Sequence, residues 1–150
     1  MALTAAPSPA ATSASGAIAA RWGRWVVGAL VAWTFLVWTT RIGNIWNDDA
    51  LETAGKVGRT ALALSFTTLA LAVVVAWWRR PALLRPAVLA LGAWSTAVWL
   101  VRGTTILLDD HDTAFTVVHE VLAVVSIALS VAAERATRRA PAPTGEPVAT

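Results

Sequence analysis

Hydrophobic side chains fill four long runs of this chain, and polar residues separate the runs instead of recurring inside them. The runs cover about 25–47, 60–78, 86–108 and 113–133. A helix rises about 1.5 Å per residue, so about 20 residues cross the roughly 30 Å of hydrocarbon in a bilayer. Each run has about that length and is apolar on all sides, which is typical of a helix surrounded by lipid. The pattern therefore predicts four transmembrane helices.

The link between the second and third runs is short and contains Pro81 and Pro86. Proline ends a preceding helix and suits the first turn of the next one, and a short link favours antiparallel neighbours. We expect an all-α membrane protein, a four-helix bundle of two tandem hairpins within residues 21–137. The segments 1–20 and 138–150 bury too little apolar surface to offset their ordering entropy, so we expect disordered cytoplasmic tails.

The two halves of the chain share a sequence pattern at an offset of 61 residues. The shared string is W-x4-W-x2-R-x3-I-x2-D-D, which begins at Trp33 and again at Trp94. Such a recurrence of Trp, Arg and Asp-Asp indicates tandem duplication of a two-helix hairpin. A unit with two spans gives both copies the same orientation, so the repeat is parallel about an axis along the membrane normal. The repeat is either a simple way to build a bundle or the basis of a pseudo-symmetric site.

The composition supports lipid as the solvent, because 57% of residues are hydrophobic, only 14% are charged and the mean hydropathy is +0.61. Soluble domains carry about 25% charged residues. The chain has nine Trp and no Tyr, and indole prefers the membrane interface. It has no Cys, which excludes disulfides, thiolate metal sites and cysteine nucleophiles.

The basic residues predict the orientation. Eight of the twelve Lys and Arg residues fall on one side of the four spans, beside only Glu134 and Glu146. These eight are Arg21, Arg24, Arg79, Arg80, Arg85, Arg135, Arg138 and Arg139. The positive-inside rule makes this side cytoplasmic, with both termini there, in the inner membrane of the cell. Because the arginines flank apolar runs, the sequence pI near 11.0 does not indicate nucleic-acid binding. The Ala, Val, Arg and Trp usage suggests a GC-rich bacterial genome.

Five polar residues near the outer ends of the spans form a candidate polar membrane site: Arg41, Arg59, Arg102, His119 and Glu120. Arg41 and Arg102 each lie seven residues before an Asp-Asp pair, inside otherwise apolar runs. An arginine at such a depth costs about 1–3 kcal/mol when it can snorkel. Either both snorkel to lipid phosphate, or they face the bundle axis and bind an anion, a lipid headgroup or carboxylates.

Glu120 needs a partner, because an isolated carboxylate in hydrocarbon is expensive. Arg102 is the first candidate, and Arg59, which occupies the repeat-equivalent position, is the second. Such a pair would lock helices together, or Glu120 and His119 would handle protons or contact a substrate. Gly55 and Gly58 would permit close approach of the second span at its outer end.

The outer loops are acidic and hold Asp48, Asp49, Asp109, Asp110, His111 and Asp112. They contain no zinc or EF-hand spacing, so we expect a solvated surface without a resident metal or cofactor. Two Asp-Asp pairs brought together by pseudo-symmetry could still hold a divalent cation loosely.

We expect a small multi-pass membrane protein whose extracytoplasmic polar site serves a transporter-like, binding or accessory role. Its ligand would be an ion, a lipid headgroup or a membrane-protein partner, which includes a second copy of the chain. No Walker, Rossmann, kinase or nucleophile-elbow motif is present. The alternative is a membrane-embedded enzyme that uses His119 and Glu120 for acid–base chemistry, with or without a metal.

Overall fold

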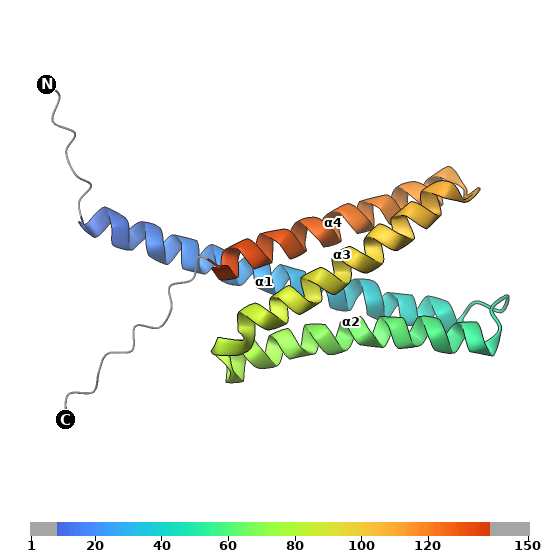
Figure 1. The fold of residues 1–150 in the computed structure, drawn as a ribbon, viewed down its shortest axis with the longest axis horizontal. Coiled ribbons are helices and arrows are strands. Elements are labelled where there is room, and N and C mark those ends of the chain that lie inside the picture. Colours follow the sequence, from blue (N-terminus) through green and yellow to red (C-terminus); the bar gives the residue numbers. More distant parts are fainter. Residues whose placement is uncertain (1–8, 139–150) are drawn as a thin grey trace, which may run out of the picture.

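Four long helices form the protein (Figure 1). A computed structural model describes the backbone of residues 9–138 and the side chains of residues 21–138. The helices are α1 (Pro9–Trp46), α2 (Thr53–Arg79), α3 (Leu84–Leu108) and α4 (Thr113–Arg138), and a 3₁₀ turn at Pro81–Leu83 precedes α3. Each helix contains a stretch of 26 to 28 residues that is long and apolar enough to cross a membrane. The stretch of α3 includes the 3₁₀ turn that precedes it. The prediction of an all-α four-helix membrane bundle is confirmed.

The first helix begins earlier than the sequence predicts. Residues 9–20, which we expected to be disordered, continue α1 toward the N-terminus. This segment is rich in Ala, which has the highest helix propensity, and it extends a helix that the following span has already nucleated. The rest of the predicted tails, 1–8 and 139–150, lies outside the described residues.

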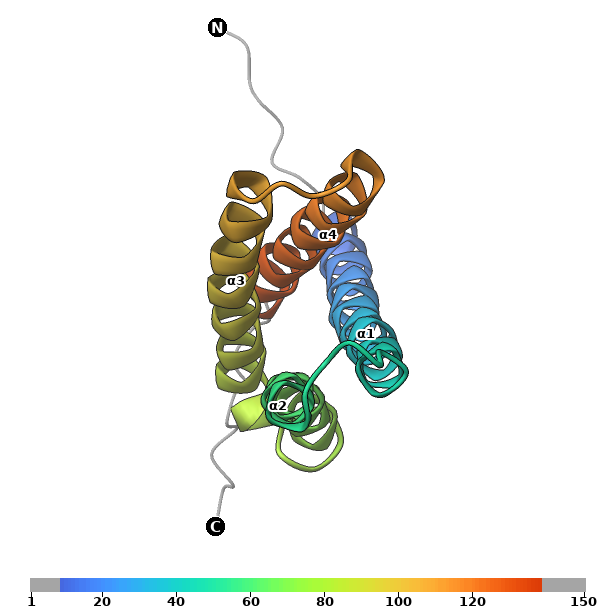
Figure 2. The ribbon, with the colours of Figure 1, turned by 90° about the vertical axis from the view of Figure 1, so that its right-hand side faces the viewer.

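The helices form two hairpins that face each other. Helix α1 packs against α2 and α4, and α3 packs against the same two helices. The α1–α2 and α3–α4 connections lie at one end of the molecule, where the hairpins diverge (Figures 1 and 2). The α2–α3 connection lies at the opposite end (Figure 1). Each helix therefore contributes one side of the bundle.

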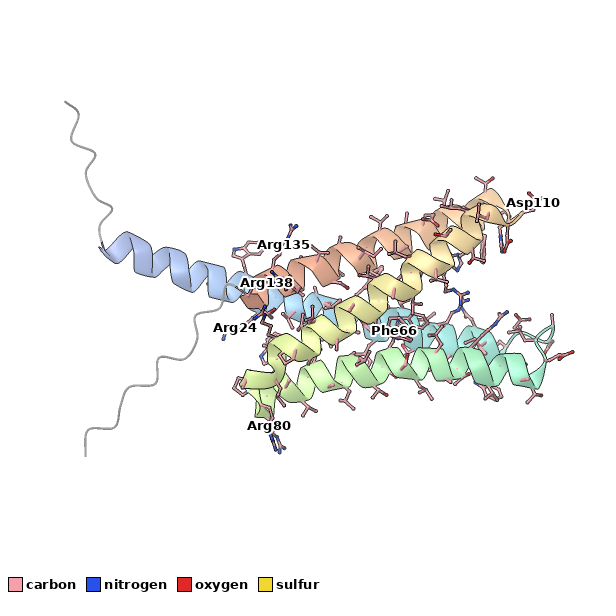
Figure 3. All side chains as sticks on the ribbon, viewed as in Figure 1. Arg24, Phe66, Arg80, Asp110, Arg135 and Arg138 are labelled. Atoms are coloured by element: carbon pink, nitrogen blue, oxygen red, sulfur yellow. The ribbon has the colours of Figure 1, made fainter. Side chains whose placement is uncertain are left out.

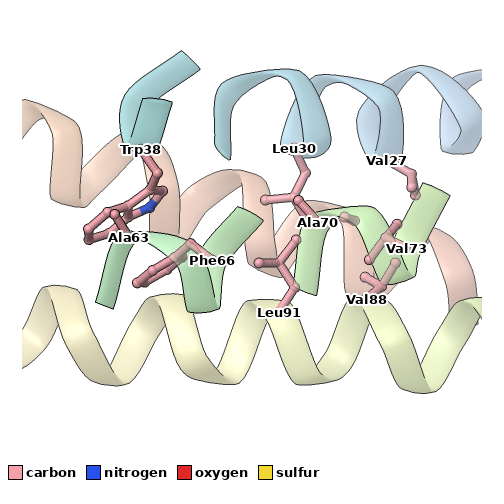
Figure 4. Packing of buried hydrophobic residues seen from close by; sticks show 10 residues of the cluster. Val27, Leu30, Trp38, Ala63, Phe66, Ala70, Val73, Val88 and Leu91 are labelled. Atoms are coloured by element: carbon pink, nitrogen blue, oxygen red, sulfur yellow. The ribbon is translucent and has the colours of Figure 1, made fainter. Parts of the chain in front are cut away.

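The apolar core runs along the inside of the bundle, where all four helices bring small and large apolar side chains together (Figure 4). The rings of Trp38 and Phe66 stack with centroids 3.9 Å apart. Lipid tails are as apolar as these side chains, so such contacts stabilise the bundle through van der Waals packing rather than through exclusion of water. The cluster comprises Val27, Leu30, Trp38, Ala63, Phe66, Ala70, Val73, Val88, Leu91 and Ala133.

Glycine permits close contact between α3 and α4. A Cβ atom at Gly92 would lie 3.3 Å from the Cβ of Ser130, and one at Gly103 would lie 3.2 Å from Oε1 of Glu120. The predicted close approach at Gly55 and Gly58 is wrong. A Cβ at Gly55 would meet only Leu51 of its own connection, and one at Gly58 would meet no atom within 4 Å. Gly58 is exposed, so no neighbouring helix covers α2 at this position.

Charge separates along the bundle axis (Figure 3). Arg24, Arg80, Arg135 and Arg138 lie at the end that carries the α2–α3 connection, which we call the basic end. Asp110 lies at the opposite end, which we call the acidic end. Arg138 also pairs with Glu134 one turn earlier on α4.

Two hydrogen bonds join the hairpins at positions that differ by 61 residues. The indole of Trp33 on α1 donates to the hydroxyl of Ser126 on α4 at 2.9 Å. The indole of Trp94 on α3 donates to the hydroxyl of Ser65 on α2, also at 2.9 Å. Each serine hydroxyl donates in turn to a carbonyl of its own helix, at 2.7 Å in both cases. Each hairpin therefore supplies one tryptophan donor and one serine acceptor to the other.

Candidate functional site

All four helices place polar side chains at one level of the bundle, between the apolar cluster and the acidic end. The Trp94–Ser65 bond aligns the antiparallel helices α3 and α2. Five residues further toward the acidic end, about 7.5 Å along each helix, Trp99 and Thr60 are level with each other. Arg41 contacts His119 across α1 and α4, and Glu120 lies against Gly103 of α3. We call this group the polar layer; it comprises Arg41, Arg59, Thr60, Trp99, Arg102, His119 and Glu120.

Three arginines from three helices converge in the polar layer. The guanidinium groups of Arg41, Arg59 and Arg102 lie close enough to repel one another. The side chains of Arg41 and Arg102 are half-buried, while Arg59 is exposed. Nitrogen-bearing side chains accordingly occupy the angle between the diverging hairpins in Figure 3. Like charges held together raise the free energy of the bundle unless a negative charge accompanies them.

Glu120 does not supply that charge through an ion pair. Among residues 21–138, the structure places no carboxylate within 4.0 Å of these guanidinium groups, so the expected pairing of Glu120 with Arg102 or Arg59 is not formed. The Glu120 carboxylate instead lies over Gly103, where the missing side chain leaves room. Arg102 precedes Gly103, and successive residues project about 100° apart around a helix, so Arg102 points away from this contact.

His119 is held in a defined orientation between α4 and α1. Its Nδ1 lies 2.8 Å from the carbonyl oxygen of Phe115. A carbonyl can only accept, so Nδ1 carries a proton and donates. Nε2 lies 3.5 Å from a guanidinium nitrogen of Arg41, and because a guanidinium group can only donate, this long contact is a hydrogen bond when Nε2 carries a lone pair. Sequence reasoning grouped these two residues in one site but did not identify their contact.

Three polar side-chain atoms in the polar layer are buried and have no hydrogen-bond partner: Oγ1 of Thr60, Nε1 of Trp99 and Oε1 of Glu120. Trp99 is only 5% exposed. A buried polar atom without a partner costs about 1–3 kcal/mol. In contrast, the buried hydroxyls of Thr34 and Ser130 donate to a carbonyl one turn earlier, at 2.8 Å and 2.7 Å. The polar layer is therefore a place where hydrogen-bonding capacity is left unused.

The sequence alone did not single out Thr60 or Trp99 as site residues. Trp99 was visible as part of the repeated string, and Thr60 follows Arg59 directly. Hydroxyl and indole groups usually find hydrogen-bond partners within the protein. Neither the repeat position of Trp99 nor the position of Thr60 beside Arg59 therefore shows that the side chain is available to a ligand.

The acidic loops have local structural roles. Asp112 caps α4 by accepting from the backbone N–H groups of Ala114 and Phe115, at 3.1 Å and 3.4 Å. Asp48 accepts from the N–H of Ala50 at 3.1 Å. The two Asp-Asp pairs belong to connections that diverge from each other (Figure 1), and within residues 21–138 no three His, Asp or Glu side chains gather as metal ligands.

Two shallow surface depressions lie outside the polar layer. One, of about 540 Å³, runs along the exposed face of α3 between Leu100 and Asp109. The other, of about 330 Å³, is formed by Arg21, Trp22 and Trp25 on α1 toward the basic end. Both are open, and the first is lined mainly by side chains that would face lipid. Neither brings together groups that could bind a charged ligand between helices.

The sequence matches no known protein family, and no curated protein or solved structure matches the chain. A function for this protein therefore follows from the residues of the polar layer and their contacts.

Proposed function

We propose that this protein binds an anion in the polar layer, within its transmembrane bundle. The observation that carries the proposal is the convergence of Arg41, Arg59 and Arg102 from three helices, with no carboxylate in ion-pairing contact. Charged side chains inside a membrane bundle are costly, and they are typical of ion and substrate pathways. A bound anion would offset both the burial of the guanidinium groups and their mutual repulsion.

The charge balance of the layer favours an anion over a cation. Three guanidinium groups are accompanied by one carboxylate, that of Glu120, which is turned toward Gly103. Among the contacts of residues 21–138, the one that joins an arginine of the layer to another of its side chains is that of Arg41 with His119, and an imidazole brings no negative charge. A cation would meet this excess positive charge, whereas an anion would be attracted by it.

We further propose that the basic end faces the cytoplasm, which places both termini there and the polar layer toward the extracytoplasmic side. The support is the gathering of arginines at the basic end (Figure 3) together with the positive-inside rule. The protein would then serve as a transporter-like, binding or accessory subunit in the inner membrane of a bacterium. Its partners would be the bilayer and either another membrane protein or a second copy of the chain.

We also interpret the two hairpins as a tandem duplication. The reciprocal Trp33–Ser126 and Trp94–Ser65 bonds support this interpretation, because a two-fold relation between the hairpins would generate one bond from the other. Near the polar layer the equivalence fails: Gly58 and Arg59 occupy the positions that correspond to His119 and Glu120.

The alternative is an enzyme that uses His119 and Glu120 for acid–base chemistry, and the geometry supports it less well. The imidazole of His119 is directed to Arg41 on α1, while the carboxylate of Glu120 lies against Gly103 on α3. An acid and a base must reach the same reacting group. Side chains directed to two different helices do not converge in this way.

Anion titrations of the purified protein in neutral detergent test the proposal. We expect chloride, sulfate, acetate or phosphate to raise the melting temperature relative to gluconate at equal ionic strength, and to give a saturable calorimetric signal. Arg59→Gln and Arg102→Gln should each weaken binding at least tenfold. Arg80→Gln, which changes an exposed arginine at the basic end, is the matched control and should bind normally. Absence of saturable binding for every anion in this panel would refute the proposal.

A further inference from the structure

We infer that the bound anion is a phosphate group, held on the α2–α3 side of the polar layer by Arg59, Thr60, Trp99 and Arg102. This inference rests on the proposed function and specifies its ligand. The four residues share two properties: each carries hydrogen-bond donors, and none has a hydrogen-bond or ion-pair partner for its side chain among the contacts of residues 21–138.

The location follows from a comparison of Arg41 with Arg102, which lie 61 residues apart. Arg41 meets the imidazole of His119 on α4. The position that corresponds to His119 is Gly58 on α2, which has no side chain, and a Cβ atom built there would meet no atom within 4 Å. Among the contacts of residues 21–138, Arg102 has no protein acceptor where Arg41 has His119, so a ligand can take the part that His119 plays for Arg41.

Two uncharged donors lie at the same level on the two helices that border this space. The indole nitrogen of Trp99 and the hydroxyl of Thr60 are both buried and unpartnered. An indole N–H can only donate, so it requires an acceptor. The indoles of Trp33 and Trp94 obtain theirs from serine hydroxyls of the facing hairpin. Trp99 has no such serine, and an oxygen atom of a ligand would satisfy it.

This donor pair does not recur on the α1–α4 side of the layer. The position that corresponds to Thr60 is Val121, which has no hydroxyl and is exposed. The position that corresponds to Arg59 is Glu120, whose charge would repel an anion. The two sides of the bundle therefore differ in chemistry, and the side formed by α2 and α3 is the one suited to an anion.

The donor set fits a phosphate group better than a halide or a carboxylate. The set comprises two guanidinium groups, one N–H and one O–H on two helices, and together these donors need several acceptor atoms. Phosphorus carries four oxygens arranged tetrahedrally, of which inorganic phosphate leaves all four and a phosphodiester leaves two without an ester bond, and guanidinium groups bind such oxygens in a bidentate manner. A carboxylate offers two oxygens in one plane, and a halide offers a single centre. Either free inorganic phosphate or a phospholipid headgroup carries the required group.

The test is calorimetry in neutral detergent with four ligands at matched ionic strength: inorganic phosphate, acetate, chloride and dihexanoyl phosphatidylglycerol below its micelle concentration. Thr60→Val and Trp99→Phe each remove one donor and nearly preserve side-chain shape. We expect each variant to bind phosphate or the short-chain lipid about tenfold more weakly, since hydrogen bonds to charged groups are stronger than neutral ones. Trp94→Phe, which removes an indole donor already paired with Ser65, is the matched control and should bind as the parent does.

The outcomes separate this inference from the proposed function. If Thr60→Val and Trp99→Phe bind every ligand as the parent does while Arg102→Gln loses binding, an anion site exists but the assignment of phosphate to these donors is wrong. Tighter binding of acetate or chloride than of both phosphate ligands also overturns the assignment. If the parent binds none of the four ligands, the proposed function itself fails. The stronger of the two phosphate ligands identifies the source of the group, and Thr60→Val alone decides the question if Trp99→Phe does not fold.

Discussion

The two indole–serine bonds between the hairpins make a quantitative prediction. In a double-mutant cycle, Trp33→Phe and Ser126→Ala remove the two partners of one bond, singly and together. Trp94→Phe and Ser65→Ala do the same for the other bond. The coupling energy of each cycle isolates the interaction from the separate effects of the two side chains.

The magnitudes follow from the surroundings of each bond. Hydrogen bonds between transmembrane helices average about 0.6 kcal/mol and reach about 1.7 kcal/mol. Ser126 is buried, whereas Ser65 is half-buried and its donor Trp94 is exposed. A bond that is shielded from competing groups is stronger. We therefore expect a coupling of about 1 kcal/mol for Trp33–Ser126 and about 0.5 kcal/mol for Trp94–Ser65.

The assay is equilibrium unfolding by sodium dodecyl sulfate in mixed micelles, followed by far-ultraviolet circular dichroism so that the tryptophan changes do not affect the signal. The crossed cycles are the controls: Trp33→Phe with Ser65→Ala, and Trp94→Phe with Ser126→Ala, use the same substitutions at positions that share no bond. Their coupling should be near zero. A crossed coupling as large as the paired one, or no coupling at Trp33–Ser126, would show that the indoles do not join the hairpins as described.

Three further substitutions test other contacts. Gly103→Ala should destabilise the bundle by about 1 kcal/mol in the same titration, because its Cβ would crowd the Glu120 carboxylate. Gly28→Ala is the control: its Cβ would meet no atom within 4 Å, so this change should be neutral or stabilising. Asp112→Ala should cost about 1 kcal/mol through loss of the α4 cap, and an unchanged unfolding midpoint would contradict that role. Glu120→Gln should strengthen anion binding several-fold by calorimetry, because it removes the one carboxylate of the polar layer; weaker binding would place Glu120 on the ligand.

Several features of this protein are determined by the sequence alone. The number of helices, their positions and the gathering of arginines near the ends of the spans all follow from the order of residues. Transfer of a segment into lipid depends on its length and on the sum of its side chains, and both are properties of a continuous stretch. The helical segment 9–20 was missed because its Ala-rich composition also resembles a disordered tail.

The contacts of the polar residues were decided by the tertiary structure. The sequence brought Arg41, Arg59, Arg102, His119 and Glu120 into one candidate site, but it paired Glu120 with arginine and overlooked Trp99. Spans that are apolar on all sides contain little information about how each helix is rotated about its axis. That rotation, together with the axial register of the helices, places Glu120 over Gly103, directs Arg41 to His119 and leaves the Trp99 indole unpartnered. Both quantities depend on packing between segments far apart in the chain, so they appear only when the four helices are assembled.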